Sequence, residues 1–172
     1  PTLDLHDAIT NVGKPLIGAI NGFAITGGFE IALMCDILVA STAAKFADTH
    51  VRMGVVPGWG LSQRLSTLVG ASRARQLSFT GNYLDAETAC RWGLVNDVLE
   101  PEVLLSHCMK IARDICSANP DTLKAVKYLI DFGVQEGLAS GLAEEARLSG
   151  ATNRGIDAQT LETRRQAVQA RG

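Results

Sequence analysis

The sequence predicts an α/β core followed by a helical region, and three observations support this fold class. The first is a set of short apolar runs with the length and flanking residues of buried strands, at residues 14–21, 36–40 and 44–47. The second is a glycine-rich turn and a helix-forming segment, 29–35, between two of these runs. The third is a change to helical spacing of apolar residues from Pro101. We therefore expect an α/β core over residues 1–100 and a C-terminal helical region over residues 101–172.

Turn and capping signals predict the rest of the core. Residues 54–60 form a loop rich in Gly and Pro. Asp85 is expected to cap a helix that runs through Trp92 and stops at Gly93. Two other helices are expected at residues 61–68 and 71–79.

The helical region is predicted from its apolar periodicity. Its first helix presents one apolar face, formed by Leu104, Cys108, Ile111 and Ile115. Asp121 is expected to cap the next helix, which Phe132-Gly133 closes. The inward residues of that helix are expected to be Leu123, Val126 and Ile130. Two more helices are expected at residues 138–148 and 157–170.

The first residues have the pattern of a helix that begins upstream of Pro1. Pro1 stands where an initiator Met would, and Leu3, Leu5, Ala8 and Ile9 have the spacing of one apolar helix face. We therefore expect that the chain lacks an upstream portion.

Composition excludes several classes of function. A net charge of −2, with no basic run longer than Arg164-Arg165, gives no field for nucleic acid. The four cysteines show no CxxC spacing and the three histidines are scattered, so no metal site is expected. The longest apolar stretches are far too short to cross a bilayer. Buried thiols and the absence of a signal peptide pattern predict a cytoplasmic protein.

The turn Thr26-Gly27-Gly28 and the nearby Glu30 are the strongest candidates for chemistry. The first backbone N–H groups of a helix have no intrahelical acceptor and carry partial positive charge, which suits an oxyanion. Glu30, in the first helical turn, would place a proton-transferring carboxylate beside that oxyanion. A tight strand-to-helix turn with a dipole-favoured Glu is the structural alternative.

A resemblance over nearly the whole chain favours the interpretation of this turn as a catalytic site. Residues 14–36, KPLIGAINGFAITGGFEIALMCD, closely resemble the signature of the enoyl-CoA hydratase/isomerase (crotonase) family. Further matching segments are Phe46-Ala47-Asp48, residues 54–60 (GVVPGWG), Gln63-Arg64-Leu65, Gly81 with Ala86 and Ala89, and Gly93-Leu94-Val95. The resemblance covers about the C-terminal two thirds of a usual member. It implies a spiral of ββα turns and a C-terminal helical region that packs in a homotrimer or a dimer of trimers.

The resemblance also implies roles for single residues. Gly27 matches the position whose N–H forms half of the oxyanion hole, and Glu30 matches the first of two catalytic glutamates. The other oxyanion donor belongs to the family's N-terminal part. His50 occupies the position of the second glutamate, where it could pass a proton, line a pocket or lie in a surface loop. Asp48, two residues away, could orient His50 or substitute for it.

The resemblance implies a lyase that adds water across the 2,3 double bond of a trans-2-enoyl-CoA. Glu30, Gly27 and His50 are its expected catalytic residues, with no metal or redox cofactor and with CoA as part of the substrate. The residues expected to bind substrate are Ala24, Thr26, Gly28, Pro57 and Trp59, although Trp59 fits a packing role equally well. A double-bond isomerase and a non-catalytic acyl-CoA binding protein are the alternatives.

Overall fold

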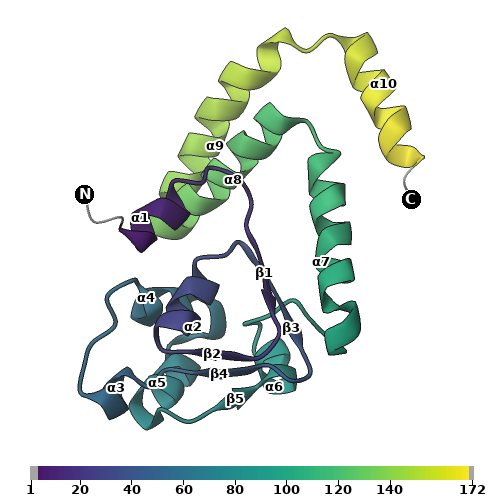
Figure 1. The fold of residues 1–172 in the computed structure, drawn as a ribbon. Coiled ribbons are helices and arrows are strands. Elements are labelled where there is room, and N and C mark those ends of the chain that lie inside the picture. Colours follow the sequence, from purple (N-terminus) through teal and green to yellow (C-terminus); the bar gives the residue numbers. More distant parts are fainter. Residues whose placement is uncertain (1–3, 171–172) are drawn as a thin grey trace. The chain divides into compact units, whose positions relative to one another are not determined.

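The computed structural model describes residues 4–170 of the chain, which form two compact units. Among the described residues, unit 1 comprises residues 4–119 and unit 2 residues 120–170 (Figure 1). The first helix, α1 (Leu5–Thr10), begins after Asp4, whose side chain accepts a hydrogen bond from the His6 N–H at 2.9 Å. Leu3, part of the apolar face expected for this helix, lies outside the described residues.

Two three-stranded sheets organise unit 1. One sheet is parallel and has the order β1 (Ile17–Ile20), β3 (Ile37–Ser41), β6 (Asp97–Leu99). The other has the order β2 (Phe23–Ile25), β4 (Lys45–Ala47), β5 (Leu84–Asp85). In this second sheet β2 runs parallel to β4, and β5 runs antiparallel to it. Strands β1 to β4 therefore alternate between the two sheets, and the turn at residues 21–22 carries the chain from the first sheet to the second (Figure 1). Strand β5 remains in the second sheet, and β6 returns to the first.

Helices cover the second sheet and enclose the main core. They are α2 (Gly27–Leu33), α4 (Leu61–Val69), α5 (Ala71–Thr80) and α6 (Ala86–Arg91). Phe29 of α2 and Phe46 of β4 are fully buried, with ring centroids 5.5 Å apart, and Leu61 and Leu65 of α4 complete this centre. Asp85 caps α6 as predicted, because its carboxylate accepts the Thr88 N–H at 2.8 Å.

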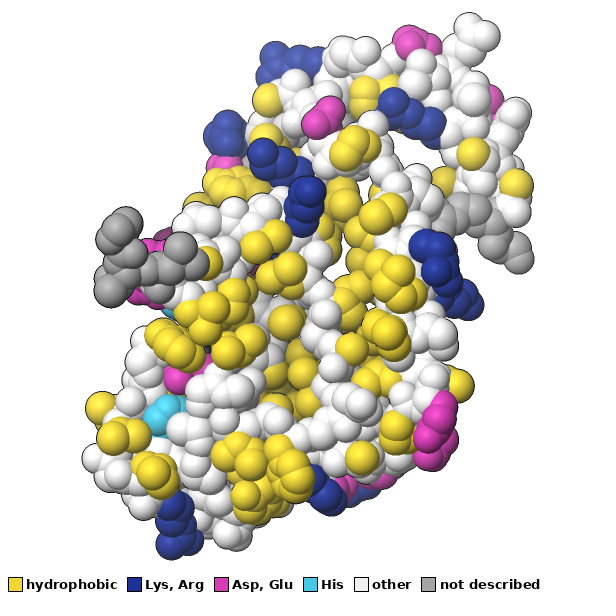
Figure 2. All heavy atoms as spheres, viewed as in Figure 1, with side chains coloured by type: hydrophobic (Ala, Val, Ile, Leu, Met, Phe, Trp, Pro, Cys, Tyr) yellow, Lys and Arg dark blue, Asp and Glu magenta, His cyan; other side chains and the backbone are white. Residues whose placement is uncertain are grey.

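One short helix, α3 (His50–Met53), follows β4 directly. It ends at Gly54, which adopts a left-handed conformation with φ of 70°. Val51 and Met53 remain exposed, and Figure 2 shows apolar side chains around α3 at the lower left.

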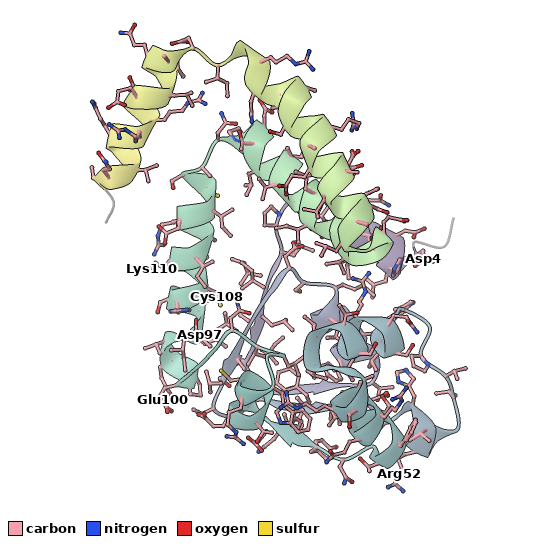
Figure 3. All side chains as sticks on the ribbon, turned by 180° about the vertical axis from the view of Figure 1, so that it is seen from behind. Asp4, Arg52, Asp97, Glu100, Cys108 and Lys110 are labelled. Carbon is pink, nitrogen blue, oxygen red and sulfur yellow. The ribbon has the colours of Figure 1, made fainter. Side chains whose placement is uncertain are left out.

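The first helix of the predicted C-terminal region, α7 (Pro101–Cys116), belongs to unit 1. Leu104 and Cys108 of its predicted apolar face are buried against Val39 of β3. Figure 3 shows Cys108 on the strand-facing side of α7 and Lys110 on the opposite side. Burial raises the pKa of the Cys108 thiol. The change to a helical sequence pattern thus lies at Pro101, whereas the boundary between the two compact units lies between residues 119 and 120.

Unit 2 contains only helices among its described residues. They are α8 (Pro120–Glu136), α9 (Leu138–Thr152), the 3-10 helix η1 (Asn153–Gly155) and α10 (Ala158–Gln169). Helices α8 and α9 approach closely, since a Cβ added at Gly141 would lie only 3.0 Å from the Gly133 Cα.

Three expectations about α8 are wrong. The helix begins at Pro120, so Asp121 lies in its first turn rather than at the cap. It continues past Phe132-Gly133, because Gly133 serves the close approach to α9 and the break falls at Gly137, with φ of 85°. Val126 and Ile130 do not point inward, since they are 46% and 62% exposed. No described helix is both long enough and apolar enough to cross a membrane.

Candidate active site

The turn before α2 has an unusual backbone conformation. Thr26 adopts φ of 53° and ψ of −115°, and it is the one described non-glycine residue with positive φ. β-branched residues adopt such angles only when surrounding contacts hold them there. The Thr26 N–H donates to the Ala47 carbonyl at 3.0 Å, and the Glu30 N–H donates to the Thr26 carbonyl at 2.9 Å. The next N–H, that of Gly27, lies at the start of α2 and has no acceptor within the helix.

A second contact fixes the same turn from its side chain. The hydroxyls of Thr26 and Thr49 form a short hydrogen bond, which joins the turn before α2 to the residue before α3. This hydrogen bond thus connects the turn that contains Gly27 directly to the segment that contains His50.

Glu30 is a buried carboxylate with both oxygens placed. It lies in the first turn of α2 and is 3% exposed. Its Oε1 accepts the Trp59 backbone N–H at 2.8 Å, and its Oε2 lies 3.5 Å from His50 Nε2. Because a buried charge is costly unless it has partners, these contacts explain how Glu30 is accommodated inside the unit.

His50 connects Glu30 to a second buried carboxylate. Its Nδ1 lies 2.7 Å from Asp48 Oδ1, and its backbone N–H donates to the same oxygen at 3.2 Å. Asp48 is 2% and His50 6% exposed. The three side chains therefore form a buried row in the order Asp48, His50, Glu30.

The structure brings several predicted site residues together. Gly27, Glu30 and His50 lie within one cluster, and Trp59 joins it through its backbone N–H and its ring, which would lie 3.7 Å from a Cβ added at Gly27. Trp59 thus both packs at the site and fixes Glu30. His50 is not in an exposed loop.

The other residues expected to bind substrate differ in their surroundings. Ala24 is 4% exposed and packs in the main core, so its side chain has a structural role. Gly28 is exposed, with open space where a side chain would be. Pro57 is half-buried in the loop before Trp59.

Two contacts at the site were not predicted from the sequence. The Thr26–Thr49 hydroxyl pair has no sequence signature, because the two residues lie on separate elements. The Trp59 N–H contact with Glu30 is made by backbone, which residue identity does not report. Within residues 4–170, no group of three or more His, Cys, Asp or Glu side chains is placed to hold a metal ion.

Comparison with known proteins identifies the class to which this fold and site belong. The enoyl-CoA hydratase/isomerase family matches residues 1–167, and the chain belongs to that family. The resemblance drawn from residues 14–36 is thereby confirmed.

Individual relatives agree with this assignment. The chain is 43% identical over 172 residues to "Probable enoyl-CoA hydratase 1, peroxisomal" of Arabidopsis thaliana, covering 100% of this chain and 65% of that protein. It is 45% identical over 137 residues to the short-chain-enoyl-CoA hydratase of Clostridium acetobutylicum, covering 80% of this chain and 52% of that protein. The chain thus spans between about half and two thirds of the length of these relatives.

Solved structures confirm the crotonase-like α/β fold. The enoyl-CoA hydratase of Bacillus anthracis superimposes with a TM-score of 0.84 at 32% identity, covering 96% of this chain and 62% of that one. The enoyl-CoA hydratase of Mycobacterium smegmatis gives a TM-score of 0.69 at 44% identity, covering 85% and 67%.

Proposed function

We propose that the protein containing this chain is a lyase that adds water across the 2,3 double bond of a trans-2-enoyl-CoA. The observation that carries the proposal is the buried contact between Glu30 and His50, beside the start of α2 where the Gly27 N–H lies. The names of the relatives, which are enoyl-CoA hydratases from bacteria and a plant, support it.

The proposed mechanism assigns one task to each group. Glu30 Oε1 is held by the Trp59 N–H, so Oε2 and His50 Nε2, which lie 3.5 Å apart, are both free to contact an attacking water beside them. As the water oxygen bonds to C3, Glu30 takes one of its protons, and the thioester carbonyl becomes an enolate. The Gly27 N–H stabilises the enolate oxygen. The Glu30–His50 pair then returns one proton to C2, so that H and OH have been added in total.

This chemistry needs no electron transfer, so the proposal includes no redox cofactor. The charge that develops is that of the enolate, and backbone N–H groups are the donors assigned to it. CoA takes part only as the substrate's carrier group.

Crotonyl-CoA hydration by the full-length gene product tests the proposal, followed as loss of absorbance of the conjugated thioester. Glu30→Gln should lower kcat by about 10²- to 10⁴-fold, because it removes the proton acceptor while keeping the shape of the side chain. Asp97→Asn is the control, since Asp97 lies at β6 beside α7 (Figure 3) and should leave kcat unchanged.

Two outcomes would contradict the proposal. Conversion of a 3-enoyl-CoA to the 2-enoyl isomer with no hydration would indicate an isomerase. Tight acyl-CoA binding without turnover would indicate a binding protein.

We propose further that the protein assembles as a homotrimer or a dimer of trimers through α8 and α9. These two helices line an apolar groove of about 370 Å³, whose residues include Val126, Ile130, Val134 and Leu142. Ile130 is 62% and Leu142 58% exposed, which is a large apolar surface for a helix pair in water. Sedimentation velocity should show Ile130→Asp shifted to a smaller species. Val168→Asp, at a 67% exposed position of α10 outside the groove, should sediment like the unsubstituted protein.

A further inference from the structure

We propose that Asp48 is a positioning residue that fixes the proton of His50 on Nδ1, so that Nε2 faces Glu30 and the two side chains act together on the substrate water. The catalytic consequence rests on the proposed hydratase function, whereas the placement of the proton does not.

The first step concerns which atom donates between Asp48 and His50. An ionised carboxylate can only accept hydrogen bonds, whereas each imidazole nitrogen either donates or accepts. Asp48 Oδ1 already accepts the His50 backbone N–H at 3.2 Å, so this oxygen acts as an acceptor. Because the same oxygen lies 2.7 Å from Nδ1, Nδ1 must carry a proton.

The second step follows at the other ring nitrogen. With Nδ1 protonated, a neutral His50 presents the lone pair of Nε2 to Glu30 Oε2, 3.5 Å away. An ionised Glu30 would then place two acceptors face to face in a site where both residues are less than 10% exposed. Two facing acceptors are satisfied by a water molecule that donates to both, which is the place that the proposed mechanism gives to the attacking water.

The third step links this arrangement to the chemistry. Hydration requires a group that accepts a proton from water and a group that returns one to C2. Glu30 and His50 can do both in turn, provided that Nε2 and not Nδ1 faces Glu30. Asp48 keeps the ring in that orientation and stabilises the imidazolium when Nε2 takes up a proton.

The chain provides its own comparison for this arrangement. Each of its three histidines lies near an Asp, but the other two pairs are at the surface. His107 Nε2 lies 3.1 Å from Asp97 Oδ2, with side chains 34% and 51% exposed. Asp97→Asn therefore removes a histidine-paired carboxylate with no link to Glu30.

The test is 15N NMR of protein labelled at the histidine ring nitrogens, with the signals of His50 assigned by their loss in His50→Gln. In the unsubstituted protein Nδ1 of His50 should be a protonated nitrogen. In Asp48→Asn the amide can donate to Nδ1, so the proton should move to Nε2. Asp97→Asn should change only the signals of His107. A bare Nδ1 in the unsubstituted protein would overturn the assignment, and this measurement needs only the His50→Gln variant to fold.

Kinetics test the catalytic part separately. Asp48→Asn should lower kcat for crotonyl-CoA hydration by about 10²- to 10⁴-fold, with KM changed by less than about threefold, because the ring orientation matters to the reaction and not to binding. A kcat within about twofold of the unsubstituted protein, together with a moved proton, would overturn the positioning role. If the unsubstituted protein did not hydrate crotonyl-CoA at all, the proposed function would fail while the NMR result still decided the tautomer.

Discussion

Replacement of Thr26 measures how much strain the turn before α2 stores. Thr26 has φ of 53°, a region that a β-branched residue enters at a cost of about 1–3 kcal/mol. Thr26→Gly removes this strain, and Thr26→Val keeps it. Both substitutions lose the hydrogen bond to the Thr49 hydroxyl, which contributes about 0.5–1.5 kcal/mol.

The difference between the two variants isolates the strain. Glycine lowers the free energy of unfolding by about 0.5–1 kcal/mol through the greater freedom of the unfolded chain. Subtracting this cost from the relief of strain, we expect Thr26→Gly to be more stable than Thr26→Val by about 1 kcal/mol. Thr49→Val is the matched control, because it removes the same hydrogen bond at a residue with φ of −95°.

Urea unfolding followed by tryptophan fluorescence is the assay. Both tryptophans, Trp59 and Trp92, lie in unit 1, so the signal reports the unit that contains the turn. A Thr26→Gly variant that is less stable than Thr26→Val would refute the idea that Thr26 is strained.

Two further substitutions test packing and capping in unit 1. Gly18→Ala should lower the free energy of unfolding by about 1–3 kcal/mol, because the added Cβ would lie 2.7 Å from the Leu38 Cδ2. An unchanged midpoint of urea unfolding would contradict this prediction. Asp85→Ala should cost about 1 kcal/mol through loss of the α6 cap. The hydrogen bond from the Thr88 N–H lowers the pKa of Asp85 below 3.8. The stabilisation by the Asp85 cap should therefore be present at neutral pH and fade as the pH falls below 3.8. If Asp85→Ala lowered the free energy of unfolding equally at pH 7 and pH 2, this reasoning would be wrong.

Much of the fold could be predicted because its signals are local. The apolar runs of β1, β3 and β4 and the cap of α6 are contained in a few consecutive residues. The strand β2 (Phe23–Ile25) was not predicted, since it is three residues long within a glycine-rich stretch and exposes Phe23 by 73%. In α8, local sequence does not distinguish Gly133, which lets α9 approach, from Gly137, which ends the helix.

The candidate site also has one part that local sequence predicts and another part that only the folded chain defines. Gly27 and Glu30 lie within one turn of a single helix, so their spacing alone brings them together. Trp59 reaches Glu30 through a backbone N–H from a distant loop, a contact that only the folded chain defines. The orientation of His50 was likewise open, because one imidazole ring offers two nitrogens and only the position of Asp48 selects between them.

The row Asp48–His50–Glu30 also predicts that a glutamate cannot simply replace His50. His50→Glu would place a carboxylate next to Asp48, where Nδ1 now lies 2.7 Å from an oxygen, and beside Glu30. Three buried carboxylates would repel one another with no cation among them, so this variant should be less stable and less active than the unsubstituted protein. Adding Asp48→Asn removes one charge and should recover part of both losses, with a coupling of about 0.5–3 kcal/mol in the unfolding cycle. Strictly additive effects of the two substitutions, in urea unfolding and in crotonyl-CoA hydration, would mean that Asp48 and residue 50 act independently. In that case Asp48 would contribute only by accepting the His50 backbone N–H at the start of α3, and would not be a partner of the imidazole ring.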